Sequence, residues 1–223
     1  MSAILFGSIS TLADTSELQR QAFNDAFSAH ELGWNWSRDD YVAMLGSNGG
    51  AKRIAEFAAS TGDDVDADAV HATKSEIFQR LLASSGVSPR PGVVPTIEAA
   101  KAAGVRVGFV TTTSRDNINA LLTALAPEID TDTFDIVVDS GSVDHPKPEA
   151  DAYTFALSEL STTSDEIVAI EDNVGGVAAA DAAGIRTIAF PNDNTSGGDF
   201  SAAAVTVASL DPQHVLDLVR DHA

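Results

Sequence analysis

One stretch of the chain decides the fold class: residues 105–126 read VRVGFVTTTSRDNINALLTALA. Its first part, Val105–Val110, is mostly apolar, which predicts a strand that is buried on both faces. The part from Arg115 to Ala126 repeats isoleucine and leucine at helical spacing and predicts a helix. A buried strand that leads directly into a helix is the repeating unit of a parallel α/β sheet.

The same unit recurs along the chain. The apolar residues 3–6 predict a first strand near the N-terminus. Segments of both kinds follow residue 126, with strands expected at 134–138, 167–170 and 185–190 and helices at 150–160 and 176–183. Continuous apolar strands that alternate with helices predict a Rossmann-like parallel sheet that is covered on both faces.

Between the first strand and Val105 the pattern changes to helices alone. Helical periodicity is found at 17–31, 39–45, 52–60 and 66–84. An all-helical insert after the first strand predicts a cap domain, residues 15–87, on an α/β core made of residues 1–14 and 88–223. Hinges are expected near 13–16 and near 85–91, where glycine and proline cluster.

Charge and composition narrow the class of function. The chain has 33 acidic and 13 basic residues and a net charge of −20, which excludes a nucleic-acid partner because phosphate-backbone binding needs a basic surface. No apolar run reaches the length of a bilayer span, no basic leader precedes one, and cysteine is absent, so we expect a cytoplasmic protein without a membrane partner. Only four residues are lysine, so an anion site must gather a few local cations.

Four separated motifs carry a family resemblance. In chain order they are GSISTLADT at 7–15, VTTTS at 110–114, KPEADAY at 147–153 and EDNVGGV at 171–177. Their order resembles that of the haloacid dehalogenase-like (HAD) hydrolase superfamily, in its CbbY, beta-phosphoglucomutase and phosphoglycolate-phosphatase-like group. The resemblance covers nearly the whole chain. It implies an α/β HAD core with a helical cap and sugar phosphates as the substrate class.

The first motif departs from the family at its reactive positions. The family pattern is Asp-x-Asp-Gly-Thr-Leu-x-Asp-Thr, in which one aspartate attacks phosphorus and the other serves as acid and base. Here Gly7 and Ile9 stand at these two positions, and Ser10 replaces the glycine. We expect strand alternation to turn Ser8 to the opposite face. Asp14 matches a further family aspartate, so neither residue replaces the lost pair.

The other motifs imply the rest of a phosphate site. The resemblance assigns phosphate binding to Thr111, Thr112 and Lys147, metal binding to Glu171 and Asp172, and a substrate loop of the cap to Lys52 and Arg53. Carboxylate oxygens are suitable ligands for Mg²⁺, and we expect the loss of the motif-one carboxylate to weaken that metal site. Purely structural roles for these residues stay open as well. Threonine and aspartate can cap the helices that follow them, and Lys52 and Arg53 can be ordinary cations on a helix surface.

The expected function is that of a CbbY-type phosphatase homologue, a pseudoenzyme whose hydrolase activity is lost or very weak. Removing a covalent nucleophile costs on the order of 10⁶-fold in turnover, and here the acid/base is absent too. Binding of a small phosphorylated metabolite is expected to remain, and no protein partner is named by the sequence. Two alternatives stay open: an active Mg²⁺-dependent sugar-phosphate phosphatase or phosphoglucomutase-like hydrolase, and a non-catalytic protein-interaction module.

Overall fold

A computed structural model describes residues 2–46 and 49–220 of the chain. Its centre is a parallel six-stranded sheet in the order β3-β2-β1-β4-β5-β6. The strands are β1 (Ala3–Phe6), β2 (Arg106–Val110), β3 (Ile136–Val138), β4 (Ile167–Glu171), β5 (Arg186–Ala189) and β6 (Val205–Thr206). The predicted Rossmann-like parallel sheet is confirmed, and β6 is an addition that the sequence did not predict.

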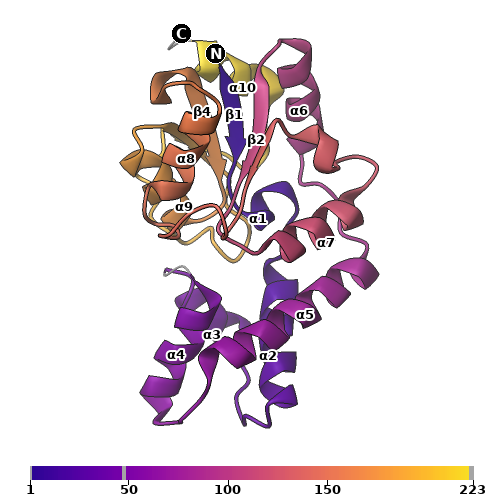
Figure 1. Ribbon diagram of the computed structural model, residues 1–223, viewed down its shortest axis with the longest axis vertical. Helices are drawn as coiled ribbons and strands as arrows, with labels where there is room; N and C mark the ends of the chain where they lie inside the picture. The colour runs from indigo at the N-terminus through magenta and orange to yellow at the C-terminus, as the bar shows by residue number, and fades with distance from the viewer. Residues whose placement is uncertain (1, 47–48, 221–223) are drawn as a thin grey trace.

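Helices cover both faces of the sheet (Figure 1). One face carries α6 (Val93–Ala102), α7 (Arg115–Leu125) and α10 (Pro212–Arg220), and the other carries α8 (Asp151–Glu159) and α9 (Val174–Ala182). Each face of the sheet packs against its helices in a hydrophobic cluster. Because side chains alternate along β1, Ile4 and Phe6 belong to the cluster with α6, α7 and α10, and Ala3 and Leu5 belong to the cluster with α8 and α9. This is why a strand buried on both faces is apolar at every position.

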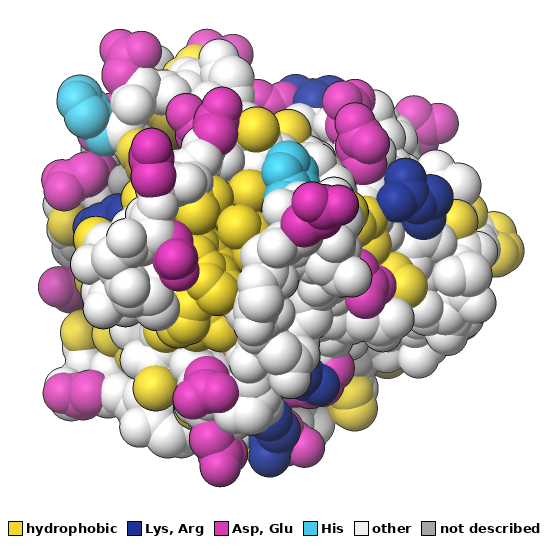
Figure 2. All heavy atoms as spheres, turned by 90° about the horizontal axis from the view of Figure 1, so that it is seen from below, with side chains coloured by type: hydrophobic (Ala, Val, Ile, Leu, Met, Phe, Trp, Pro, Cys, Tyr) yellow, Lys and Arg dark blue, Asp and Glu magenta, His cyan; other side chains and the backbone are white. Residues whose placement is uncertain are grey.

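Four more helices form a separate helical block beyond the carboxyl ends of the strands, at the opposite end from both chain termini (Figure 1). They are α2 (Ser16–Ala29), α3 (Arg38–Ala43), α4 (Gly50–Thr61) and α5 (Ala67–Ser85). The block has an aromatic interior, in which the ring of Trp36 lies 5.0, 4.6 and 5.4 Å from those of Phe23, Phe27 and Phe57. Figure 2 looks at this end and shows a hydrophobic area ringed by acidic side chains.

The helical block faces the edge where open α/β sheets bind their ligands, outside the carboxyl ends of the strands. Each of the four helical segments predicted here overlaps one of the observed helices. None of the helices in the described ranges combines the length and hydropathy that a membrane span requires.

Helices α6 and α10 were not predicted from the sequence. Helix α6 reads VVPTIEAAKA, and no element was predicted for this segment. Pro95 lies in the first turn of α6, where a missing amide hydrogen costs no helical hydrogen bond. Helix α10 follows a polar stretch near the C-terminus in which no element was predicted.

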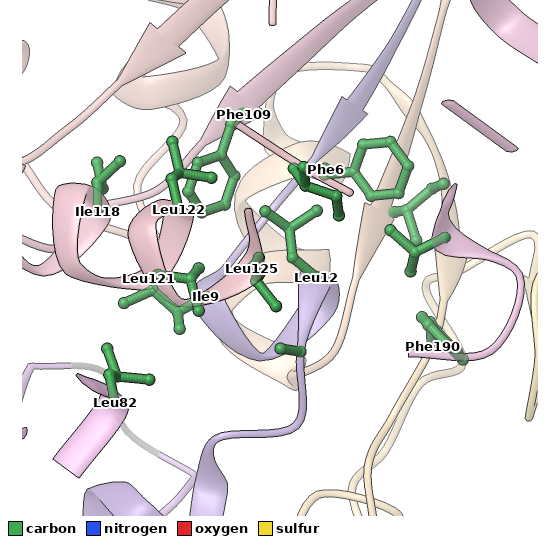
Figure 3. Packing of buried hydrophobic residues seen from close by; sticks show 14 of the residues in the cluster. Phe6, Ile9, Leu12, Leu82, Phe109, Ile118, Leu121, Leu122, Leu125 and Phe190 are labelled. Carbon is green, nitrogen blue, oxygen red and sulfur yellow. The ribbon is translucent and has the colours of Figure 1, made fainter. Parts of the chain in front are cut away.

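The chain turns immediately after β1. Residues Ile9–Leu12 form a single helical turn, α1, so strand alternation stops at Phe6 and the expected orientation of Ser8 is wrong. Figure 3 shows Ile9 beside Leu121 of α7, and its side chain is only 4% exposed. The residue at the acid/base position has therefore become part of the hydrophobic core.

Candidate functional site

A cavity of about 610 Å³ lies between the sheet and the helical block. From the core, its wall includes Ser8, Thr111, Thr112, Lys147 and Asp172; from the block, it includes Gln19, Arg53, His71 and Lys74. Cations line both sides. The structure thus brings five of the seven residues that the motifs singled out for binding to one cavity wall, and α2 and α5 add polar residues that include Gln19, His71 and Lys74.

The hydroxyls of the second motif follow β2 directly. The buried Thr111 donates its amide to the Val138 carbonyl at 3.0 Å, and its hydroxyl accepts from the Thr113 amide at 3.3 Å. Ser114, not Thr111, caps α7 by accepting from the Asn117 amide. The hydroxyls and amides near this helix N-terminus suit an anion.

Lys147 and Glu171 form a buried ion pair on the core side. The lysine nitrogen lies 2.5 Å from Glu171 Oε1 and donates to the Val110 carbonyl at 2.7 Å. The Tyr153 hydroxyl donates to the same carboxylate oxygen at 2.7 Å. Burial, reinforced by the charge of Glu171, raises the pKa of Tyr153, so this phenol stays a donor. The contacts with Lys147 and Tyr153 hold the Glu171 carboxylate in the protein interior, away from the cavity wall.

The space for Glu171 exists because two neighbours are glycines. A Cβ built on Gly7 would overlap with the Glu171 carboxyl group, and a Cβ on Gly176 would do the same. Glu171 is fully buried, and its second oxygen, Oε2, has no hydrogen-bond partner in the described protein. The nucleophile position is therefore not an open gap: a carboxylate from the neighbouring strand fills the place of its side chain.

Asp172 is surrounded by neutral donors. Its Oδ1 accepts from the Ser8 hydroxyl and, at 2.9 Å, from the Asn173 amide, while its Oδ2 accepts from Asn192 at 3.1 Å. Burial, and then the charge of Glu171, raises the pKa of Asp172. Asn173 also caps α9, so the acidic pair is not needed for that role.

These contacts do not fit a Mg²⁺ ion, which prefers an octahedral set of oxygen ligands made of one or two free carboxylates, several waters and substrate phosphate oxygens. Glu171 is turned toward Lys147, both oxygens of Asp172 accept hydrogen bonds, and Gly7 brings no ligand. Across residues 2–46 and 49–220, no three His, Cys, Asp or Glu side chains are grouped as a metal site would require. The side chains of the described residues therefore do not form a divalent-metal site by themselves.

The two cations predicted for the cap loop are separated. Lys52 is exposed, lies 3.8 Å from the Glu56 carboxylate and is not part of the cavity wall. Arg53 is buried and lines the cavity, with its guanidinium 5.9 Å from the ring of Phe23 and 5.7 Å from that of Tyr41. Only the second residue of the pair can reach a ligand in the cavity.

Lys74 is the cation that sequence reasoning missed. It is buried, lines the cavity, and donates to the Gln19 amide oxygen. Its nitrogen lies 4.8 Å from the ring of Phe23 and 4.9 Å from that of Phe78. Burial, and then the nearby charge of Arg53, lowers the pKa of Lys74 to about 7.

A signal for Lys74 was present in the sequence. The buried residues of α5 include Val70, Lys74, Ile77 and Phe78, which share one helical face. A lysine on the apolar face of a helix, in a chain with four lysines, marks a cation that the fold buries.

Known proteins resemble this chain over most of its length. A sequence model described as haloacid dehalogenase-like hydrolase matches residues 6–190. The chain belongs to this HAD family. Protein CbbY of Rhodobacter capsulatus is 37% identical over 213 residues, which cover 94% of each chain. The Cereibacter sphaeroides CbbY is 39% identical over 205 residues, covering 90% of this chain and 89% of the relative.

Solved structures of HAD proteins have the same fold as this chain. CbbY from Rhodobacter sphaeroides in complex with phosphate superimposes with a TM-score of 0.87 at 37% identity, covering 94% of each chain. A mutant of the same protein in complex with xylulose-(1,5)bisphosphate gives a TM-score of 0.88 at the same identity and coverage. The predicted resemblance to the CbbY-like group of HAD proteins is confirmed.

Proposed function

We propose that this protein binds a phosphorylated sugar in the cavity and does not hydrolyse it through an aspartyl-phosphate. The observation that carries the proposal is the surroundings of Gly7. The nucleophile position has no side chain, and the Glu171 carboxyl group occupies the space next to it without reaching the cavity wall. Attack on phosphorus needs an accessible nucleophile in line with the leaving oxygen, and neither residue supplies one.

Protonation of the leaving group is the second step for which the family's residue is missing. A sugar alkoxide leaves only when an acid protonates it. Ile9, at the acid/base position, packs in the hydrophobic core beside α7. Ser8 faces the cavity, but its hydroxyl already donates to Asp172.

Anion binding is supported by the groups that remain. Thr111, Thr112 and the ammonium of Lys147 line the core side, and Arg53 lines the block side. Residues 15–87 would act as the cap over this cavity, with a phosphate group at the core end and the sugar toward the helical block. CbbY, a similar protein, was crystallised with phosphate and with xylulose-(1,5)bisphosphate, which supports a phosphorylated sugar as the ligand class.

Two measurements on one preparation test the proposal. Hydrolysis of p-nitrophenyl phosphate and xylulose-1,5-bisphosphate is followed with Mg²⁺ present, with a HAD phosphatase as positive control. Inorganic phosphate is titrated in a thermal-melt assay against chloride of matched ionic strength. A ligand at ten times its dissociation constant adds about 1.4 kcal/mol of stability, which such an assay resolves.

The proposal predicts a phosphate-dependent shift, smaller in Thr111→Val, together with background hydrolysis. Clear turnover that Thr111→Val reduces would support the active-phosphatase alternative instead. Neither turnover nor a phosphate shift would support the protein-interaction alternative.

A further inference from the structure

The cavity wall contains two buried lysines with different neighbours. Lys147 is ion-paired with Glu171, and an ion-paired ammonium has no lone pair with which to attack carbon. Lys74 has a neutral hydrogen-bond partner, the amide oxygen of Gln19. The two amines therefore differ in whether a counter-ion holds the nitrogen in its charged form, which has no lone pair for nucleophilic attack.

The burial of Lys74 favours the neutral amine. The faces of Phe23 and Phe78, 4.8 and 4.9 Å from its nitrogen, attract a cation, but the loss of water around the buried amine disfavours the charged form more strongly. Arg53, on α4 of the same helical block, adds a like charge that acts in the same direction. Desolvation next to a second cation is the established way to turn a lysine into a nucleophile.

Other titratable groups near the amine do not reverse this effect. Burial lowers the pKa of His71, one turn earlier on α5, to about 4, so this imidazole is neutral at physiological pH. Glu76 and, from α7, Asp116 also line the cavity. The charged group that acts on Lys74 is Arg53, and it lowers the pKa of the amine to about 7 together with burial.

We propose that Lys74 captures its ligand covalently by attacking the carbonyl carbon of an open-chain phosphorylated ketose or aldose. The nitrogen–carbon bond forms as the carbonyl π bond breaks. The amine nitrogen gives up its two protons and the oxygen takes up two. The remaining carbon–oxygen bond breaks as the nitrogen–carbon double bond forms, the oxygen leaves as water, and the product is a reversible imine. This step rests on the proposed function, because the phosphate must sit at the Thr111 and Lys147 end of the same cavity.

The ligand class follows from the chemistry of both ends. Lys147 and the hydroxyls beside it suit a phosphate group, and the amine of Lys74 suits a carbonyl group. A sugar phosphate in its open-chain form carries both groups. A phosphorylated polyol of the same length has no carbonyl and cannot form the imine.

Reductive trapping tests the proposal. The protein is incubated with dihydroxyacetone phosphate, a small phosphorylated ketone, and sodium borohydride reduces any imine to a stable secondary amine. Peptide mass mapping then assigns the label among the four lysines. We expect the label on Lys74, its suppression by inorganic phosphate, and its loss in both Lys74→Met and Lys74→Arg. The exposed Lys52, changed in Lys52→Met, is the matched control and should leave labelling unchanged.

The arginine variant keeps a cation at this position and guards against a simple folding defect, since its melting temperature and phosphate shift are measured on the same sample. Label on Lys147, or equal label on Lys52 and Lys74, would overturn the proposal. An unlabelled protein that still gives the phosphate-dependent melting shift would also overturn it while leaving the proposed function standing. Absence of that shift in the unmodified protein would overturn both.

Discussion

On the core side of the cavity a buried lysine lies 2.5 Å from a buried carboxylate, whereas on the block side a buried lysine lies against two phenyl rings and a neutral amide. The charge of Lys147 is already compensated by Glu171 within the protein. Among the described residues no carboxylate is ion-paired with Lys74, and the charge of Arg53 acts against the charged form of this amine. The comparison indicates that the ion pair of Lys147 contributes mainly to stability, whereas the protonation of Lys74 depends on pH.

The largest effect should come from breaking the core pair. Lys147→Met leaves the fully buried Glu171 without its counter-ion, which we expect to lower the free energy of unfolding by about 3–5 kcal/mol. Urea denaturation measures it. Lys52→Met, on an exposed lysine, should stay within about 0.5 kcal/mol of the unmodified protein. Equal stability of the two variants would show that the core pair is not a structural element.

The next effect concerns the space beside Gly7. Gly7→Ala adds a Cβ that overlaps with the Glu171 carboxyl group, so we expect a loss of roughly 1–3 kcal/mol from overpacking. Gly33→Ala, where nothing lies near the added atom, is the control in the same denaturation assay. If Gly7→Ala were as stable as the control, Glu171 would be free to turn away, and Gly7→Asp could restore a nucleophile.

The contribution of Lys74, on the block side, to the free energy of unfolding should depend on pH. Lys74 binds its proton below about pH 7 when folded and below 10.5, its ordinary pKa, when unfolded. The unfolded state holds more protons between these values, so this lysine makes stability rise with pH from about 7 to 10.5. The cost of burying its charge is fully present below pH 7.

Lys74→Met should therefore be more stable than the unmodified protein at pH 6, by on the order of 1–2 kcal/mol, and the difference should shrink toward pH 10. Denaturation across this pH range measures it, and Lys101→Met on α6 provides a control without such a trend. A pH-independent difference would mean that Lys74 keeps its ordinary proton affinity.

The smallest effect concerns phosphate contact alone. Thr111→Val removes one hydroxyl from the cavity wall, and we expect phosphate affinity to fall by about 1 kcal/mol with little change in stability. Isothermal titration measures the change. Thr123→Val, on α7 and exposed, should bind phosphate as the unmodified protein does. Equal affinity of both variants would remove Thr111 from the site.

Much of this architecture could be predicted because its signals are local. The strands that became β1, β2 and β4 are apolar runs, and the helices of the block show their periodicity directly. Motif order brought Thr111 and Lys147 to one cavity correctly. These inferences required no knowledge of how distant side chains meet.

The rest depends on contacts between segments far apart in the chain. The sequence shows that Gly7 lacks a carboxylate, but only the fold shows that Glu171 fills the space. Ser8 was misplaced because the alternation of side chains does not continue past Phe6, where β1 ends and the chain turns. Lys74 was missed because its environment comes from α2 and α4 as well as from its own helix.

A crystal structure of the protein soaked with phosphate and Mg²⁺ tests the central claim most directly. We predict an anion between Thr111 and Lys147, with Glu171 still packed against Gly7. Asp172 should keep its hydrogen bonds to Ser8, Asn173 and Asn192, with no metal bound. A Mg²⁺ ion ligated by Glu171 and Asp172, with both carboxylates turned toward the phosphate, would contradict the account.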